Sequence, residues 1–271
     1  MRLIDVKSFA LSEFFGSNIP HYAILSHTWG AEEVTFQDWQ NLKRASRMQG
    51  FEKIRDACLQ ARRDGYRWLW VDTNCIDKTS SSELTEAINS MYRWYADAGI
   101  CYAYLADYSP RATSRSKFSD SRWFTRGWTL QELVAPKEVV FYGADWHFIG
   151  RKSDTLLEAI SSVTGIPTVV FRNPKLIGVQ SIAERMSWLA GRKTTREEDM
   201  AYCTLGLFDI NMPLLYGEGM KAFTRLQEEI IKVSTDHTIF CWHWTAHTPK
   251  DWVSLLAPSP QAFSYGSRYQ S

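Results

Sequence analysis

Residues 121–136 read SRWFTRGWTLQELVAP, and the rest of the chain is interpreted outward from this stretch. The pattern predicts one short helix that ends at Pro136, because proline cannot continue a helix and biases the preceding residue away from helical geometry. At helical spacing Trp128 and Glu132 are four residues apart and share a face. The apolar residues around them indicate a helix buried on most sides, so the Glu132 carboxylate needs a cleft or a partner.

Two interpretations of Glu132 follow from the residues alone. In the first, it forms an ion pair with Arg122, Arg126 or another nearby base. In the second, it is a functional carboxylate that faces a cleft. The choice between them depends on what the rest of the chain brings near this helix.

The composition limits the classes of protein to which this chain can belong. The 271 residues suit one large domain or a domain with an extension, and 45% of them are hydrophobic. A net charge of +1, with acids and bases interspersed, argues against a nucleic-acid or membrane-surface partner. No apolar run is long enough to cross a membrane, and the first residues lack the layout of a signal peptide. Five widely spaced cysteines without a C-x-x-C pair predict no metal site and a reduced, cytoplasmic protein.

Short apolar runs alternate with helical patterns through the first part of the chain. Strands are expected near 22–26, 68–72, 100–106 and 138–142, and helices near 51–61, 82–97 and 156–163. This alternation predicts an α/β fold whose parallel sheet carries helices on both faces. Ligands of such folds bind beyond the carboxyl ends of the strands. The residues expected at those ends are Ser26, His27, Trp29, Gly30, Asp72, Asp77 and Asp107.

After about residue 175 the strand patterns stop. Three helices are expected at 181–190, 197–208 and 217–233, with Thr195 and Glu198 as a capping box, and an edge strand at 237–242. The last residues are rich in Pro, Ser, Tyr and Gln without a period, which predicts a loose tail or linker. We therefore divide the chain into an α/β core at 1–175, a helical extension packed on it at 176–242, and a tail at 243–271.

Five blocks of sequence carry a resemblance to a known family. They read YAILSHTWG at 22–30, WLWVDTNCIDK at 68–78, SELTEAINSMYRWY at 82–95, SRWFTRGWTLQELVAP at 121–136 and EDMAYCTLGLFDINMPLLYGEGMKAFTRLQEEI at 198–230. Together they resemble the fungal HET domain of heterokaryon-incompatibility proteins over most of residues 20–242. The resemblance implies a role in programmed cell death when non-self is sensed, with a nucleotide-binding receptor as partner in cis or in trans.

The HET domain in turn resembles the TIR domain, which has a flavodoxin-like fold. Enzymatic TIR domains cleave the nicotinamide–ribose bond of NAD, and their catalytic glutamate lies in a motif of the type S-x-x-W-C-x-x-E-L. Here Trp128, Glu132 and Leu133 keep the spacing, whereas Thr129 replaces the cysteine and Thr125 stands in the place of the serine. The resemblance implies that Glu132 is catalytic, that NAD is a substrate rather than a cofactor, and that the active form is a homo-oligomer.

The chemistry of this bond suits a single carboxylate. Cleavage passes through an oxocarbenium-like ribosyl centre with a good leaving group, so one carboxylate can stabilise the developing charge without a general acid. Glu132 is the expected catalytic residue, and no second acid can be placed from the sequence. The residues expected to bind the substrate are Ser26, His27, Trp29, Gly30, Asp72, Arg126 and Trp128.

Several alternatives stay open at this point. A non-catalytic adaptor that serves assembly, or a nucleotide-binding sensor without turnover, is the alternative to an enzyme. The choice between NAD and NADP, and between a cyclised and an open product, is also undecided. Either a structural role or a role in binding is possible for a histidine, two turn aspartates and a basic loop. These residues are His27, Asp72, Asp77, Arg111, Arg115 and Lys117.

Overall fold

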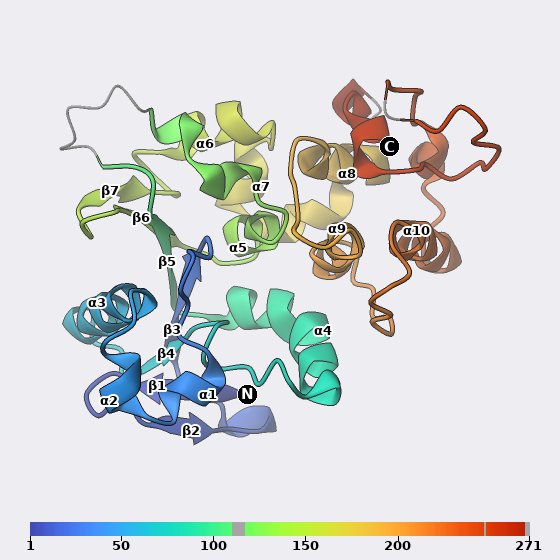
Figure 1. The fold of residues 1–271 in the computed structure, drawn as a ribbon. Helices are drawn as coiled ribbons and strands as arrows, with labels where there is room; N and C mark the ends of the chain where they lie inside the picture. Colours follow the sequence, from blue (N-terminus) through green and yellow to red (C-terminus); the bar gives the residue numbers. More distant parts are fainter. Residues whose placement is uncertain (110–116, 247, 269–271) are drawn as a thin grey trace.

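The computed structural model describes residues 1–109, 117–246 and 248–268 (Figure 1). In these residues the strands form one seven-stranded sheet in the order β2-β1-β4-β3-β5-β6-β7. Their bounds are β1 Arg2–Asp5, β2 Leu11–Glu13, β3 Tyr22–His27, β4 Trp68–Trp70, β5 Ile100–Leu105, β6 Val139–Gly143 and β7 Phe148–Arg151. The expected α/β class and the four predicted strands are confirmed.

The sheet is mixed rather than parallel throughout. Its centre, β4-β3-β5-β6, is parallel, as predicted. The edge strands β1, β2 and β7 run antiparallel to their neighbours, which corrects the prediction of a wholly parallel sheet. The reason is the length of the connections: five residues join β1 to β2 and four join β6 to β7, whereas a parallel pair needs a crossover of a dozen residues or more.

Helices cover both faces of the parallel centre, as expected (Figure 1). The helix α3 (Gly50–Arg63) lies on one face, where the Tyr102 hydroxyl of β5 donates to Asp64 at 2.7 Å. The helices α4 (Ser81–Asp97) and α5 (Thr129–Val134) lie on the other face, and the neighbouring Cys101 points toward Glu132 of α5. Adjacent residues of a strand point to opposite faces of the sheet. Cys101 and Tyr102 are adjacent, so α3 and α5 lie on opposite faces.

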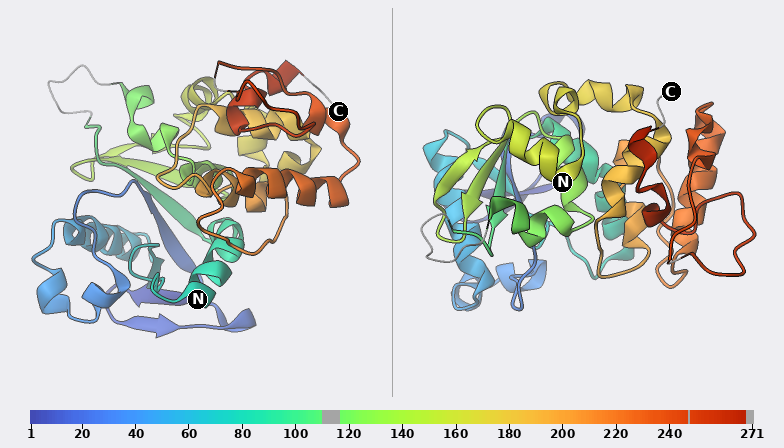
Figure 2. Two further views of the ribbon diagram at one scale, coloured as in Figure 1. Left: turned by 45° about the vertical axis from the view of Figure 1, so that its right-hand side comes forward. Right: turned by 90° about the horizontal axis from the view of Figure 1, so that it is seen from above.

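The remaining helices are short except for α8 and α10. Their bounds are α1 Phe36–Trp39, α2 Leu42–Ala45, α6 Leu157–Thr164, α7 Thr168–Arg172, α8 Ile182–Ala190, α9 Asp199–Tyr202 and α10 Lys221–Val233. The C-terminal helices gather on the side of the sheet that carries α4 and α5 (Figures 1 and 2). There Gly206 lies so close to Tyr92 of α4 that a Cβ would overlap the ring, so the extension packs directly on the α/β core.

Three predictions for the C-terminal part differ from the structure. The helix expected at 197–208 is only α9 followed by a 3₁₀ turn, and residues His237–Phe240 form a 3₁₀ turn instead of an edge strand. The tail is not loose over its described residues, because Phe263 is buried and 3₁₀ residues Pro260–Phe263 pack on α8. Among the described residues no helix is long and apolar enough to span a membrane.

Two segments have the sequence pattern of a capping box, namely Ser80 with Glu83 and the predicted pair of Thr195 with Glu198. Ser80 caps α4 by accepting from the Glu83 amide at 3.3 Å, but the Glu83 carboxylate turns to the Asp77 amide and to Arg2. The second capping box is wrong. Glu198 accepts instead from the amides of Gly217 and Gly219, at 2.7 and 3.0 Å, and so fixes the turn before α10.

Candidate functional site

The stretch 121–136 forms two short helices rather than one. A 3₁₀ turn spans Arg122–Thr125, and α5 begins only at Thr129. The break arises because a distant segment takes the backbone bonds: the Lys193 amide donates to the Thr125 carbonyl at 2.7 Å, and the Gly127 amide to the Lys193 carbonyl at 2.9 Å. Trp128 and Glu132 nevertheless line one cavity, as their spacing predicted.

The far end of α5 is held by a lysine. Lys152, which follows β7, is fully buried, and its ammonium group donates to the carbonyls of Leu133 and Pro136. A cation at the C-terminal carbonyls of a helix is electrostatically favourable. Burial lowers the pKa of Lys152 to about 8. This contact orients the helix that carries Glu132.

A cavity of about 360 Å³ lies where α4, α5, the carboxyl ends of β3 and β4, and the extension meet. It contains six of the eight residues predicted for the site, namely His27, Trp29, Asp72, Arg126, Trp128 and Glu132. Ser26 does not line it but contacts Glu132 directly. Gly30 lies outside the lining, where its amide donates to Glu33 at 2.5 Å. Of the residues expected at the strand ends, the structure brings His27, Trp29 and Asp72 together in this cavity, whereas Asp77 and Asp107 lie outside its lining.

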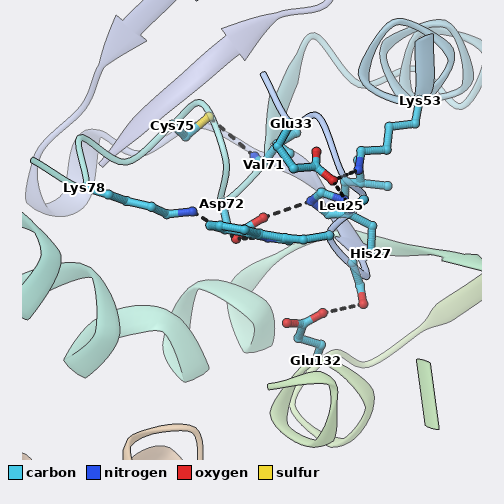
Figure 3. Close-up of polar contacts among 12 residues, drawn as sticks. Leu25, His27, Glu33, Lys53, Val71, Asp72, Cys75, Lys78 and Glu132 are labelled. Carbon is cyan, nitrogen blue, oxygen red and sulfur yellow. Dashed lines mark hydrogen bonds and ion pairs between the residues drawn. The ribbon is translucent and has the colours of Figure 1, made fainter. Parts of the chain in front are cut away.

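Glu132 lies at the floor of the cavity with only 7% of its surface exposed. One carboxyl oxygen accepts from the Ser26 hydroxyl at 2.5 Å, and Ser26 in turn accepts from the Trp123 indole at 2.8 Å. Figure 3 shows the other oxygen pointing away from this bond. Burial raises the pKa of Glu132 to about 8, against the opposing effect of its hydrogen bond to Ser26. The carboxyl group is therefore mostly protonated at neutral pH.

The predicted ion pair between Glu132 and a nearby arginine is wrong. Arg122 lies 3.4 Å from the carboxylate of Asp107 instead, and the Arg126 guanidinium donates to Thr195. Glu132 is thus a buried acid that accepts a hydrogen bond from a neutral hydroxyl, that of Ser26. Such an acid is expensive unless it has a functional or electrostatic reason to be there.

The sheet side of the cavity is a closely bonded cluster around Asp72 (Figure 3). One carboxylate oxygen accepts from His27 Nε2 at 3.0 Å, and the other from the Trp29 indole at 3.0 Å and from Lys78 at 3.3 Å. The Lys78 ammonium also lies 3.8 Å from the Trp29 ring centre. Burial opposes ionisation of Asp72, but the charge of Lys78 and these hydrogen bonds hold its pKa well below the usual range.

The helical side of the cavity was not foreseen. It is formed by Thr195, Arg196, Asp199 and Tyr216 of the extension, together with Arg126. The Tyr216 hydroxyl donates to Asp199 at 3.0 Å, and Arg196 stacks on the Tyr216 ring at 4.4 Å. Burial raises the pKa of Asp199. A further carboxyl group with a raised pKa, that of Asp199, therefore lines the cavity with Glu132.

Other candidate residues lie outside the cavity. Asp77 shapes its own turn by accepting from the Thr79 amide at 3.0 Å, which supports its structural interpretation. Arg111 and Arg115 fall outside the described residues, and Lys117 begins a 3₁₀ turn. Among the described residues no group of three or more His, Cys, Asp or Glu side chains is placed to hold a metal ion.

The cavity therefore combines acids, cations and aromatic rings suited to a polar ligand with an aromatic part. Residues 22–117, which carry its sheet side, match the family model described as "Heterokaryon incompatibility protein (HET)". The chain carries a HET domain.

A curated relative of this HET-domain protein is the "Vegetative incompatibility protein HET-E-1" of Podospora anserina. The two are 49% identical over 224 residues, which is 79% of this chain but 16% of the relative. The HET-domain chain thus spans about a sixth of the length of that relative. No solved structure matches it.

Proposed function

We propose that this HET domain acts in heterokaryon incompatibility and cell death by cleaving the nicotinamide–ribose bond of NAD or NADP. The observation that carries the proposal is Glu132, a buried acid at the floor of a cavity with one oxygen held by Ser26. The order of the parallel strands adds support. In chain order they run 2-1-3-4 across the sheet, as do the first four strands of the flavodoxin-like arrangement, and the cavity lies at their carboxyl ends.

In the proposed reaction the bond between C1′ of the ribose and the nicotinamide nitrogen breaks, and its electron pair leaves with neutral nicotinamide. Water adds to C1′ and releases one proton to solvent, which balances the hydrolysis. The ionised carboxylate of Glu132 stabilises the ribosyl cation. The positively charged nicotinamide ring favours that form, because an opposite charge nearby lowers the pKa of a carboxyl group.

The other cavity residues have distinct proposed roles. Trp128 forms the aromatic wall beside Glu132, and Arg126 meets a phosphate, since its guanidinium donates only to Thr195 among the described residues. Asp199 offers a carboxyl group to a ribose hydroxyl or an amide. A cavity of about 360 Å³ is at the small end for ligand pockets, so it accommodates the nicotinamide riboside part of the substrate.

The cavity also bears on the alternatives. An adaptor that serves only assembly needs no cleft at Glu132. The cavity at Glu132 is open and lined by charged groups. Activation by self-association belongs to the proposal, as does a location in the cytoplasm and a receptor partner. A sensor without turnover would use the same cavity, and only a measurement of product separates it from an enzyme.

The test is NAD consumption by the purified protein, alone and artificially clustered, with nicotinamide release followed by chromatography. We expect turnover in the wild type and a loss of about a thousandfold in Glu132→Gln, the size of effect known for a lost transition-state contact. The matched control is Glu184→Gln, because Glu184 is also a partly buried glutamate with a raised pKa but lies on α8 outside the cavity lining. Turnover that survives in Glu132→Gln would refute the assignment. Binding of NAD without product would indicate the sensor.

A further inference from the structure

The extension is joined to the loop before α5 at a close junction. Residues 193 and 125–127 exchange two backbone hydrogen bonds, and Arg126 and Lys193 form an isolated parallel bridge. Gly127 permits this approach, because a Cβ there would lie 2.5 Å from Thr194 Cγ2 and 3.1 Å from the Cys203 sulfur. The backbone before the helix that carries Glu132 is therefore set by the extension.

Arg192 extends from this junction into the protein and is only 3% exposed. Its Nη1 donates to the Arg126 carbonyl at 2.8 Å and to the Thr129 hydroxyl at 2.9 Å, and its Nε donates to the Trp188 carbonyl at 3.2 Å. Nη2 is buried without an acceptor among the described residues. All of these acceptors are neutral. A buried guanidinium with no carboxylate bonded to it is costly, so its position needs a reason.

The reason lies one turn along α5. Thr129 and Glu132 are three residues apart on the helix and so lie on neighbouring parts of one face. Burial lowers the pKa of Arg192 to about 10, and the carboxylate form of Glu132 opposes that fall. Arg192 therefore stays a cation at neutral pH.

Other titratable groups act on Glu132 from several of the surrounding elements. They are Asp72 after β4, Tyr95 on α4, Cys101 on β5 and Cys203 after α9. Burial raises the pKa of Tyr95 and of both thiols well above neutral, so these three are uncharged at pH 7. Asp72 is an anion and disfavours a second negative charge at Glu132. Arg192 is a buried cation that acts on Glu132, whereas the cations Lys78, Arg126 and Arg196 line the cavity.

We propose that Arg192 is a positioning residue for Glu132. It fixes the start of α5 through Arg126 and Thr129, and it supplies the buried positive charge that permits Glu132 to ionise when the cavity is occupied. The catalytic part of this inference rests on the proposed function, whereas the effect of Arg192 on the ionisation of Glu132 does not. The extension is then part of the site and not only a support for it.

The experiment measures the titration of Glu132 in the full chain by difference infrared spectroscopy, with Glu132→Gln to identify its band. Arg192→Gln keeps a neutral donor and removes the charge, whereas Arg192→Lys keeps the charge. We expect the titration midpoint to move upward by about one pH unit in the first variant and to stay near the wild-type value in the second. The pH profile of nicotinamide release should move by the same amount, with about a tenfold loss of rate at neutral pH in Arg192→Gln.

The matched control is Arg185→Gln, because Arg185 is an arginine of α8 that donates to the Leu207 carbonyl at 2.8 Å and lies outside the cavity lining. It should lower stability without moving the Glu132 midpoint. If Arg192→Gln does not fold, Arg192→Lys still tests the inference, since a midpoint far above the wild-type value there would contradict it. An unchanged midpoint in Arg192→Gln would also overturn it. A shifted midpoint in Arg192→Gln, together with no turnover in the wild type, would reject the enzyme and keep the coupling.

Discussion

On the sheet side of the cavity Asp72 accepts hydrogen bonds from three side chains, and its pKa is held low. On the helical side Asp199 accepts from Tyr216, and at the floor Glu132 accepts from Ser26, and burial raises the pKa of both. The carboxylate charge of Asp72 on the sheet side is thus stabilised before any ligand arrives. The carboxyl groups of Glu132 at the floor and of Asp199 on the helical side have raised pKa values, so their charge depends on the ligand that enters the cavity. We infer that the first side provides rigidity and the second recognises the ligand.

The largest effect expected from this contrast is a pH dependence of stability. The pKa of Glu132 is about 8 when folded, above the 4.5 of a glutamate in an unfolded chain, so the folded state binds more protons between these pH values. The stability that this group contributes is complete below pH 4.5 and is lost as the pH rises through 8. From pH 5 to pH 8 the Glu132→Gln variant should gain stability relative to the wild type by as much as about 4 kcal/mol.

Urea unfolding at several pH values measures this difference. The Glu184→Gln variant is the control, because Glu184 lies outside the cavity lining and its own raised pKa should produce a smaller slope. A constant difference between wild type and Glu132→Gln across the range would show that Glu132 titrates normally, and the contrast between the two sides would fail.

The second prediction concerns the rigid side. In Asp72→Asn the amide cannot accept from His27, Trp29 and Lys78 as the carboxylate does, and the Lys78 charge loses its partner. We expect a loss of about 2 kcal/mol of unfolding free energy, reduced from the value for a fully buried pair because both side chains keep some exposure. Asp77→Asn, a neighbouring turn aspartate outside the cavity, should cost less than half as much. Equal losses of unfolding free energy in the two variants would contradict the prediction that the cluster around Asp72 stabilises the fold more than an ordinary turn aspartate does.

The smallest predicted effect is on the helical side. Arg126→Met should weaken binding of ADP-ribose about tenfold, by loss of one charge-assisted contact to phosphate, and leave the thermal midpoint almost unchanged. Calorimetric titration measures the affinity. Arg122→Met is the control, since Arg122 pairs with Asp107 away from the cavity. If both variants bind like the wild type, the phosphate does not lie at Arg126.

The sequence located the parts of the site that depend on local order. Glu132 and Trp128 were found because their spacing puts them on one face, and His27 and Asp72 because the carboxyl ends of parallel strands meet at one edge. Both arguments require only the element type and the chain direction. They held although the helix at 121–136 proved to be two shorter pieces.

The helical side could not be predicted in the same way. Arg196, Asp199 and Tyr216 reach the cavity only because the extension docks on α4 and α5, and no periodicity in 195–216 specifies that docking. The edge strand β7 was missed for a related reason. It is four residues long and two of them are exposed, so its residues lack the apolar alternation on which strand prediction depends.

Lys152 and Arg192 hold opposite ends of a helix that has only six residues. A helix of that length has no stability of its own, so its geometry belongs to the chain segments that bind it. For the evolution of the domain this means that residues 125–129 and 191–194 cannot diverge independently. A bulkier residue at Gly127 requires a smaller one at Thr194, and a neutral residue at position 192 requires a new source of charge near Glu132. Lineages of this domain should therefore record paired substitutions across that junction, while the exposed surface of α10 changes freely.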